Sequence, residues 1–345
     1  LGIRYWEIGN EIWLQSEPDL HGSTLPDGTV LPGKPNDPVT YGKESARYIQ
    51  AMKHVDPTIQ IGVHMNGDPF SSKLYGAMKE AGAVPDFVVY HAYPCGPESS
   101  DIATLTHSKR FFGETVASLR NELERNFGPE ADGITLFFNE FNATYQAGKQ
   151  TASLINGLYM ADVIGAAMTK GVENITWFLY RQADAGVTFY GNNKDMLYGW
   201  RRARTTIGKP SWYGDIQLIG VETNDKYPSF YMAKLINRFL REGDAILSVE
   251  TPDFLLTPYA TTGKDGSVRV LLINKSADTA YDADLLVGGG SMNGPAHLFW
   301  YGPENDAANA TGEGNPDVTI TTASFDETSS ALTIPPLTAV LVVLN

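Results

Sequence analysis

The chain is organised around the stretch Tyr5-Trp6-Glu7-Ile8-Gly9-Asn10-Glu11. Residues 3–8 are apolar and aromatic enough to predict a buried strand, and the glycine and asparagine that follow end it. Glu11 then lies at the carboxyl tip of this strand. A second apolar run, residues 134–138, ends in the same way, with Asn139 and Glu140 at its tip. The two carboxylates Glu11 and Glu140 are therefore predicted to occupy equivalent positions on two strands.

Strand and helix patterns alternate through the first part of the chain. Strands are predicted at residues 3–8, 59–65, 86–93, 134–142 and 174–181, and helices at 39–55, 71–81, 109–127, 151–170 and 229–241. Such alternation implies a parallel sheet with right-handed crossovers. Carboxylates at the carboxyl ends of such strands lie where a (β/α)8 TIM barrel keeps its catalytic groups. We therefore predict an α/β fold in which residues 1–242 belong to a catalytic barrel.

The pattern changes after about Ala245, where short strands follow one another without helices. They are predicted at residues 254–260, 268–274, 283–287, 296–300, 318–322, 331–334 and 339–344. This spacing is typical of an all-β sandwich, so residues 243–345 are predicted to form a second, β-sandwich domain. The last run, Ala339 to Leu344, is apolar on both faces and is therefore expected to be a central strand.

Composition excludes several classes of function. The 345-residue chain has a net charge of −14, which disfavours nucleic acid as a partner. It contains no apolar run of about 18 residues, so no membrane span is expected. The single cysteine, Cys95, allows no intrachain disulfide. Metal-ligand spacing, a glycine-rich phosphate loop and a Gly-x-Ser-x-Gly elbow are all absent from the sequence, so neither a metal nor a cofactor is expected.

Two carboxylates on two strand tips fit the chemistry of a retaining glycosidase, in which one carboxyl group transfers a proton and the other attacks the sugar. We assign Glu11 as the acid/base, which requires a raised pKa from burial and a neighbouring carboxylate. Glu7 has the same strand parity but lies deeper, as a structural ion-pair partner would. Glu140 is assigned as the nucleophile, on one inward face with Leu136 and Phe138. A solvated loop glutamate and a salt-bridged strand end are the structural alternatives for the two catalytic assignments.

These motifs resemble those of a known group of enzymes. The stretch from Trp6 to Glu11 resembles the acid/base strand of clan A glycoside hydrolases, nearest to family 51, the α-L-arabinofuranosidases and related endoglucanases. His91-Ala92-Tyr93-Pro94 resembles the sixth strand of that clan, and Asn139-Glu140-Phe141-Asn142 resembles its nucleophile strand. Trp177 would lie on the eighth strand. A sandwich after the barrel also matches that family.

The resemblance implies further site residues. It suggests that Asn10 donates a hydrogen bond to the sugar 2-hydroxyl and that Tyr93 hydrogen-bonds the nucleophile. His91 would line the same pocket, and Trp177 or Tyr180 would offer an aromatic face to a sugar ring. Each residue also has a structural alternative, because a turn asparagine, a core histidine and core aromatics are common at such positions. His64 on the second predicted strand is expected to have a core or polar-network role.

The sequence departs from the clan in one respect. The acid/base of the clan lies on strand four, so residues 1–242 correspond to strands four to eight, the C-terminal part of the barrel. Five strands cannot close such a barrel, and their apolar edges would be exposed. We therefore expect either a fragment, or a second copy or separate chain that completes the barrel. The chain begins without Met and shows no signal peptide, which leaves a leader or upstream domain open.

The predicted function is a retaining glycoside hydrolase that cleaves plant cell-wall polysaccharide by double displacement. An endo-β-1,4-glucanase (cellulase) type is slightly favoured, because the long polar loop of residues 12–38 is able to wall a cleft. An α-L-arabinofuranosidase is the alternative within this class. A non-catalytic carbohydrate-binding remnant of a barrel glycosidase is the alternative from another class. A polymeric plant substrate implies a secreted or extracellular protein.

Overall fold

The computed structural model describes residues 2–96, 99–145, 150–181, 216–220, 224, 226–287, 290–291, 293–326 and 331–344. The chain forms two compact units. The first comprises Leu1–His91, Glu114–Glu140 and Gly171–Thr176, and the second comprises Ala92–Gly113, Phe141–Lys170 and Trp177–Asn345. Each unit therefore draws on segments that are far apart in the sequence.

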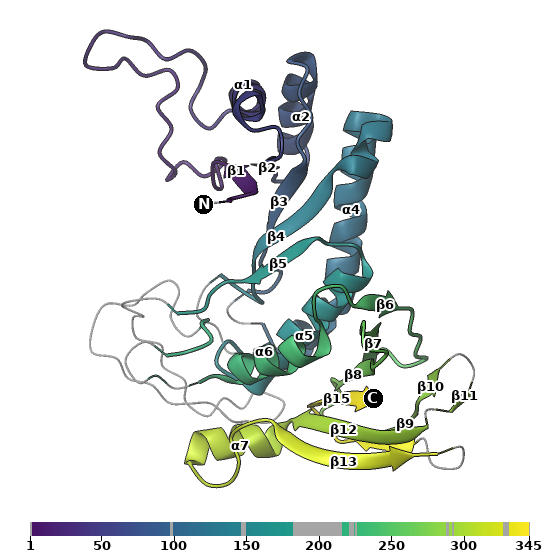
Figure 1. Ribbon diagram of the computed structural model, residues 1–345. Coiled ribbons are helices and arrows are strands. Elements are labelled where there is room, and N and C mark those ends of the chain that lie inside the picture. Colours follow the sequence, from purple (N-terminus) through teal and green to yellow (C-terminus); the bar gives the residue numbers. More distant parts are fainter. Residues whose placement is uncertain are drawn as a thin grey trace. The chain divides into compact units, whose positions relative to one another are not determined.

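A parallel sheet of five strands dominates the first unit (Figure 1). Its strands follow the order of the chain: β1 (Tyr5–Ile8), β2 (Gln60–His64), β3 (Phe87–Ala92), β4 (Thr135–Phe141) and β5 (Asn174–Trp177). Helices connect successive strands, namely α1 (Pro38–Val55), α2 (Phe70–Glu80), α4 (Lys109–Phe127) with the 3-10 turn η1 (Gly128–Gly133), and α5 (Leu154–Thr169). A strand order that never departs from chain order is that of a (β/α)8 barrel, so the predicted partial barrel is confirmed.

The edge strand β1 differs from its prediction. It was expected to be buried, but Tyr5 is 42% exposed and Trp6 is 41% exposed. The physical reason is that β1 pairs only with β2 among the described strands, in the register Glu7 to Gly62 and Ile8 to Val63. An aromatic strand with one neighbour keeps part of its apolar surface in contact with water.

Helix α1 begins and ends where its sequence predicts. Asp37 is the N-cap, and its carboxylate accepts the backbone N–H of Thr40 at 2.9 Å. Pro38 occupies the first turn, where its missing N–H costs nothing. The helix ends before Asp56 and Pro57, which cannot continue it. These signals define both ends of α1 from local sequence alone.

The second unit combines helices with antiparallel sheets. Its helices include α5, α6 (Pro228–Phe239) and α7 (Pro303–Thr311), together with α3 (Asp101–His107), which was not predicted from the sequence. The larger sheet has the order β13-β12-β15-β8-β7-β6 and the smaller sheet pairs β14 with β9. The strand bounds are β6 Ala245–Leu247, β7 Leu256–Thr262, β8 Val268–Asn274, β9 Tyr281–Asp284, β10 Leu286–Val287, β11 Gly290–Ser291, β12 Gly294–Tyr301, β13 Thr319–Phe325, β14 Ala331–Ile334 and β15 Thr338–Leu344.

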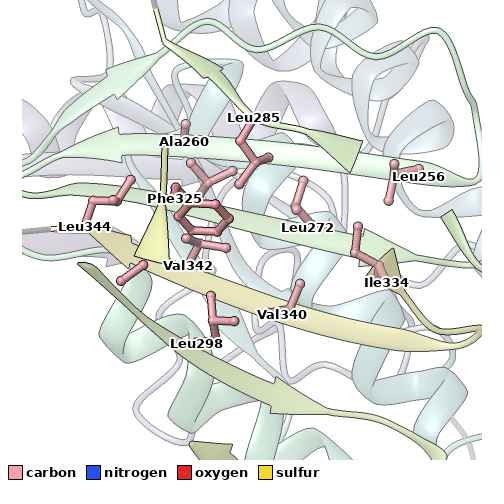
Figure 2. Packing of buried hydrophobic residues seen from close by; sticks show 12 residues of the cluster. Leu256, Ala260, Leu272, Leu285, Leu298, Phe325, Ile334, Val340, Val342 and Leu344 are labelled. Carbon is pink, nitrogen blue, oxygen red and sulfur yellow. The ribbon is translucent and has the colours of Figure 1, made fainter. Parts of the chain in front are cut away.

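The core of the β region lies between these sheets (Figure 2). It is built from alternate residues of β7, β8, β12 and β15, such as Leu272, Leu298 and Val340. Phe325 at the end of β13 and Ile334 at the end of β14 belong to the same cluster. Strand β15 pairs with β12 on one side and with β8 on the other. The prediction that Ala339 to Leu344 is a central strand is thus confirmed.

Helix α5 is apolar on every side, and nearly all of its residues are buried. It packs against α3, α6, β7 and β8 within the second unit. The helices α5 and α6 therefore group with the strands that follow Ala245, and the boundary proposed between residues 242 and 243 stays a prediction. Among the described helices, none combines the length and the apolar character that crossing a membrane requires.

Candidate active site

Glu11 lies in the turn directly after β1, in the first unit. Its φ of 41° is in the left-handed region, which residues other than glycine, asparagine and aspartate seldom adopt. Its backbone N–H donates to Nδ1 of His64, at the end of β2, over 3.0 Å. The parallel pairing of β1 with β2 brings the ends of the two strands together, so this turn is fixed from the neighbouring strand.

His91 connects the two predicted catalytic carboxylates. Its Nδ1 lies 2.7 Å from Oε1 of Glu11 and 3.3 Å from Oε2 of Glu140. The imidazole is nearly buried at 4% exposure, whereas each carboxylate side chain is 25% exposed. One ligand atom from each of these three residues lies within 4.8 Å of the other two. The residues predicted from two distant strand tips therefore meet at one place.

The electrostatics of Glu11 differ from the expectation. The pKa of Glu11 lies below its ordinary value, because the hydrogen bond from His91 outweighs burial, and the charges of His91 and His64 lower it further. An acid/base with a raised pKa was predicted. The prediction is wrong for this arrangement because it considered burial and Glu140 but not a donor between the two carboxylates. Loss of the His91 contact would leave burial, which raises the pKa of Glu11.

Glu7 belongs to a polar network beside the two carboxylates. Its Oε2 accepts the side-chain amide of Asn139 at 2.6 Å, and its Oε1 lies 3.3 Å from Nδ1 of His64. The hydroxyl of Tyr41, on α1, donates to the carbonyl of Ile8 and accepts the backbone N–H of His64. Glu7 thus lies beside polar side chains of β2 and β4. An ion pair with His64 would need the ring protonated, so the ion-pair role expected of Glu7 stays a prediction.

The faces of β4 are reversed relative to the prediction. Phe137 stacks on Phe87 with ring centroids 4.2 Å apart, and Asn139 reaches Glu7, so these two β4 residues share the face of the site. Phe138 instead packs against Tyr90, with 5.7 Å between centroids. The predicted inward column of Leu136, Phe138 and Glu140 is wrong, because a strand that is apolar on both faces gives no parity signal. Glu140 contacts His91 from near the end of the strand.

Besides His91, the predicted substrate-binding residues are Asn10, Tyr93, Trp177 and Tyr180. Asn10 is exposed in the bend after β1. Tyr93, Trp177 and Tyr180 belong to the second unit, where Tyr93 packs edge-on against Phe178 and Trp177 packs against Phe141. Their predicted sugar contacts, and that of Asn10, stay predictions.

Two residues of the site were not found from the sequence. Tyr41 closes the network from α1, and Trp13 packs its ring edge-on to His64, with 4.6 Å between centroids. Tyr41 looked like an ordinary core position of an amphipathic helix, and Trp13 lies in a loop without periodicity. No local signal distinguishes either residue, because each contact joins segments many residues apart.

The same cluster has donors for a cation. Within the described residues, Glu11, His91 and Glu140 offer two carboxylate oxygens and an imidazole nitrogen at ligand spacing. Such a mixed set also serves proton transfer, and in this structure His91 is used as a hydrogen-bond donor to Glu11. The expectation that the protein uses no metal and no cofactor stays a prediction.

Comparison with known proteins places the fold. No protein-family model and no curated protein matches this sequence. Among solved structures, a family 51 α-L-arabinofuranosidase from Thermotoga petrophila matches 100% of this chain and 66% of its own, with 19% identity and a TM-score of 0.69. A family 44 endoglucanase from Clostridium thermocellum matches 100% of this chain and 67% of its own, with 15% identity and a TM-score of 0.64.

A family 39 β-xylosidase from Caulobacter crescentus is also similar, with 15% identity, a TM-score of 0.57, and coverage of 90% of this chain and 62% of its own. All three are clan A glycoside hydrolases. The resemblance to that clan is therefore confirmed in the fold, and family 51 enzymes are among the similar structures. The chain spans about two thirds of the length of the structures that it matches, 66% for the first of them.

Proposed function

We propose that this chain carries the two-carboxylate site of a retaining glycoside hydrolase. The observation that supports this most is the approach of Glu11 and Glu140, whose nearest ligand oxygens lie within 4.8 Å. Retaining enzymes hold their carboxyl groups about 5–5.5 Å apart, whereas inverting enzymes leave room for a water. The fold of the similar glycosidases, with carboxylates at the ends of two barrel strands, supports the same chemistry.

In the proposed first step, Glu140 attacks the anomeric carbon while Glu11 protonates the departing oxygen. Glu11 must carry a proton at that moment, although His91 favours its ionised form. A substrate that accepts the hydrogen bond of His91 in place of Glu11 would leave burial as the main influence on Glu11, and burial raises the pKa of that carboxyl group. In the second step the ionised Glu11 activates water, and the unliganded geometry suits that role.

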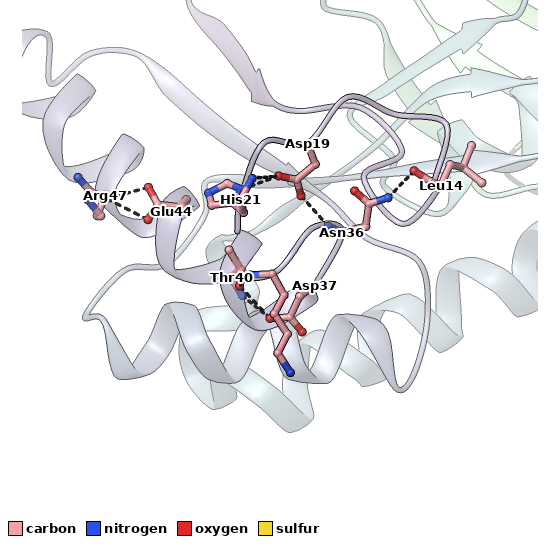
Figure 3. A network of polar contacts seen from close by, with 9 residues as sticks. Leu14, Asp19, His21, Asn36, Asp37, Thr40, Glu44 and Arg47 are labelled. Carbon is pink, nitrogen blue, oxygen red and sulfur yellow. Dashed lines mark hydrogen bonds and ion pairs between the residues drawn. The ribbon is translucent and has the colours of Figure 1, made fainter. Parts of the chain in front are cut away.

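We propose a plant cell-wall polysaccharide as substrate, with endo-β-1,4-glucanase (cellulase) action slightly favoured. The loop after Glu11 supports a cleft wall, because it is tied together by polar contacts (Figure 3). Asp19 accepts the backbone N–H groups of His21 at 2.9 Å and Asn36 at 2.6 Å, and the Asn36 side chain donates to the carbonyl of Leu14. Between them, Thr24 and Val30 form an antiparallel bridge. A loop of this kind holds its shape when a chain binds beside it.

An α-L-arabinofuranosidase is the alternative, supported by the similarity to solved family 51 enzymes of that activity. A non-catalytic carbohydrate-binding protein is the alternative from another class. A secreted or extracellular location belongs to the proposal because the proposed substrate is an extracellular polymer. A second copy or a separate chain that completes the barrel also belongs to it.

Azide rescue of the two alanine variants tests the assignment. Glu140→Ala and Glu11→Ala should each lower turnover by orders of magnitude. Azide should restore activity to Glu140→Ala with an inverted glycosyl azide, because the small anion fills the space of the nucleophile from that face. The inverted product from Glu11→Ala instead would exchange the two roles. Glu7→Ala is the matched control; a loss as large as that of Glu11→Ala, in folded protein, would contradict the proposal.

The substrate is decided by two assays on the wild-type chain. An endo-acting enzyme should lower the viscosity of soluble cellulose or xyloglucan faster than it releases reducing ends, whereas an arabinofuranosidase should hydrolyse an aryl α-L-arabinofuranoside. Calorimetric titration with cello-oligosaccharide tests the third possibility, a non-catalytic carbohydrate-binding protein. Binding without any hydrolysis would favour the carbohydrate-binding alternative over both enzymes.

A further inference from the structure

We propose that His64 is the positioning residue of Glu11, the candidate acid/base. In this inference the unprotonated Nδ1 of His64 accepts the backbone N–H of Glu11 and holds the turn from which the Glu11 carboxylate reaches the site. The inference rests on the proposed function for its catalytic consequence, but the hydrogen bond itself can be tested without turnover.

The turn needs such a partner. Glu11 has a φ of 41°, which strains a residue with a side chain unless its surroundings hold it there. The contact between the Glu11 N–H and His64 Nδ1, at 3.0 Å, crosses from the turn to the adjacent strand. Because the side chain of Glu11 leaves the same backbone, a shift of this N–H moves the carboxylate relative to His91 and Glu140.

The acceptor is itself closely packed. The side chain of His64 is fully buried, and its own backbone N–H donates to the hydroxyl of Tyr41 at 2.9 Å. Its ring packs edge-on to Trp13, at 4.6 Å between centroids, and to His91, at 4.2 Å. The backbone of His64 is thus held by α1, and its ring packs against β3 and the loop after Glu11, so the ring is a fixed point for the turn.

The protonation state of His64 decides whether the bond exists. Nδ1 faces both the N–H of Glu11, at 3.0 Å, and Oε1 of Glu7, at 3.3 Å. A proton on Nδ1 would be donated to Glu7 and would leave the Glu11 N–H without its acceptor. Burial favours the neutral ring: it lowers the pKa of His64, as does the charge of His91, while the contacts with Glu7 and the charge of Glu11 oppose this. A neutral ring carries its proton on one nitrogen, and the inferred hydrogen bond, which the 3.0 Å contact of Nδ1 with the Glu11 N–H indicates, belongs to the tautomer with that proton on Nε2. The charged or titratable groups that face the ring are thus Glu7, Glu11, His91 and Tyr41.

Two substitutions separate positioning from packing. His64→Asn places an amide oxygen near the position of Nδ1 and retains an acceptor. His64→Leu fills similar volume without an acceptor. His54→Leu, at an exposed position on α1, is the matched control. Each is made in the full chain, and circular dichroism establishes that the variants are folded.

The first measurement is amide hydrogen exchange at Glu11, followed by NMR. We expect protection in the wild type and in His64→Asn, and loss of protection in His64→Leu. Equal exchange in wild type and His64→Leu would overturn the inference, whatever the activity. A wild type that hydrolyses no glycoside would contradict the proposed function while leaving this measurement decisive for the hydrogen bond.

The second measurement compares kcat/KM for a dinitrophenyl glycoside, whose departure needs no acid, with that for the phenyl glycoside of the same sugar. A displacement near 1 Å costs about 10²-fold in rate. His64→Leu should lose roughly that factor on the phenyl glycoside and little on the activated one, and His64→Asn should recover most of it. Equal losses on both substrates would indicate a purely structural role and overturn the inference.

Discussion

Removing one partner of the buried pair of Asp162 and Lys275 should destabilise the second unit by several kcal/mol, roughly the cost of leaving one buried charge unpaired. Asp162 lies in the middle of the apolar helix α5, and Lys275 follows β8, so the pair joins a helix to the β region. Both side chains are 0% exposed, with Nζ and Oδ2 2.9 Å apart. The hydroxyl of Ser108 also donates to the carboxylate, and that of Tyr259 does so at 2.7 Å. Lys275→Met removes the cation but retains most of the aliphatic stem.

The magnitude follows from burial. Removing one partner of a buried pair costs about 3–5 kcal/mol, because the other charge stays in a poorly solvating environment. In the variant, the hydroxyl groups of Ser108 and Tyr259 still donate hydrogen bonds to Asp162. They partly solvate its charge, so the cost should lie in the lower half of that range. We therefore expect Lys275→Met to lower the free energy of unfolding by about 3 kcal/mol at neutral pH.

The effect should depend on pH. Burial alone would raise the pKa of Asp162, but the charge of Lys275 and the hydrogen bonds from Ser108, Lys275 and Tyr259 hold it below its ordinary value. A depressed folded-state pKa stabilises the fold above the unfolded value, about 3.9, and this contribution is lost as the pH falls through the folded value. Without Lys275 burial dominates and Asp162 can take up a proton, so the difference between variant and wild type should shrink as the medium is acidified from neutral pH.

Urea unfolding followed by circular dichroism measures both effects. Arg125→Met is the control, since the pair of Arg125 and Asp68 is largely exposed and should change stability by less than about 1 kcal/mol. A loss in Lys275→Met no larger than in this control would refute the reasoning, as would a destabilisation that grows on acidification.

Two further predictions concern the first unit. Gly62→Ala should lower the free energy of unfolding in urea by about 1–3 kcal/mol, because the added Cβ would lie 2.1 Å from the Phe87 ring. Gly76→Ala, on α2 with open space around the added Cβ, should instead raise it by about 0.5–1 kcal/mol. A Gly62→Ala variant more stable than Gly76→Ala would contradict this account of the packing. His91→Leu should raise the pKa of Glu11 in a carbon-13 NMR titration of the glutamate carboxyls, since burial then dominates; an unchanged or lower pKa would show that His91 is not the main cause.

The alternation of elements was predictable because it depends on local patterns. The helix of residues 109–127 and the strand of residues 268–274 match the structure, since periodicity and glycine or aspartate stops act over a few residues. The short helix α3 was missed because seven residues carry too few turns for a clear period. The faces of β4 were assigned wrongly because a strand apolar on both faces has no alternation to read.

The candidate site was predictable in its residue types but not in its electrostatics. Glu11, His91 and Glu140 were found from strand-end positions and from the resemblance. The lowered pKa of Glu11 depends on which ring nitrogen lies 2.7 Å from which oxygen, a distance that no sequence pattern specifies. Tyr41 likewise contributes through contacts with residues 33 and 23 positions away. Such contacts are set by the packing of whole elements.

The last prediction concerns the exposed edge of the first unit, which we propose is covered by a second copy or a separate chain. Beside β1 lies an apolar groove of about 660 Å³, lined by Ile3, Trp6, Tyr48, Met52 and Val55 among others. Val55 is 84% exposed, although fully burying such a side chain is worth about 1.5–3 kcal/mol. The edge of β1 that pairs with no other strand among the described residues adjoins this surface, so covering both together is favourable.

Sedimentation velocity at micromolar concentration tests this directly. The wild type should sediment as a dimer, or bind a separate chain that supplies strands, and Val55→Glu should weaken the association by placing a charge in the groove. Leu286→Glu, at an apolar position of the second unit that is 63% exposed, is the control and should leave association unchanged. The edge is stable in water as it stands if the wild type sediments as a monomer, binds no strand-supplying chain and sediments like Val55→Glu. In that case neither a second copy nor a separate chain covers the edge.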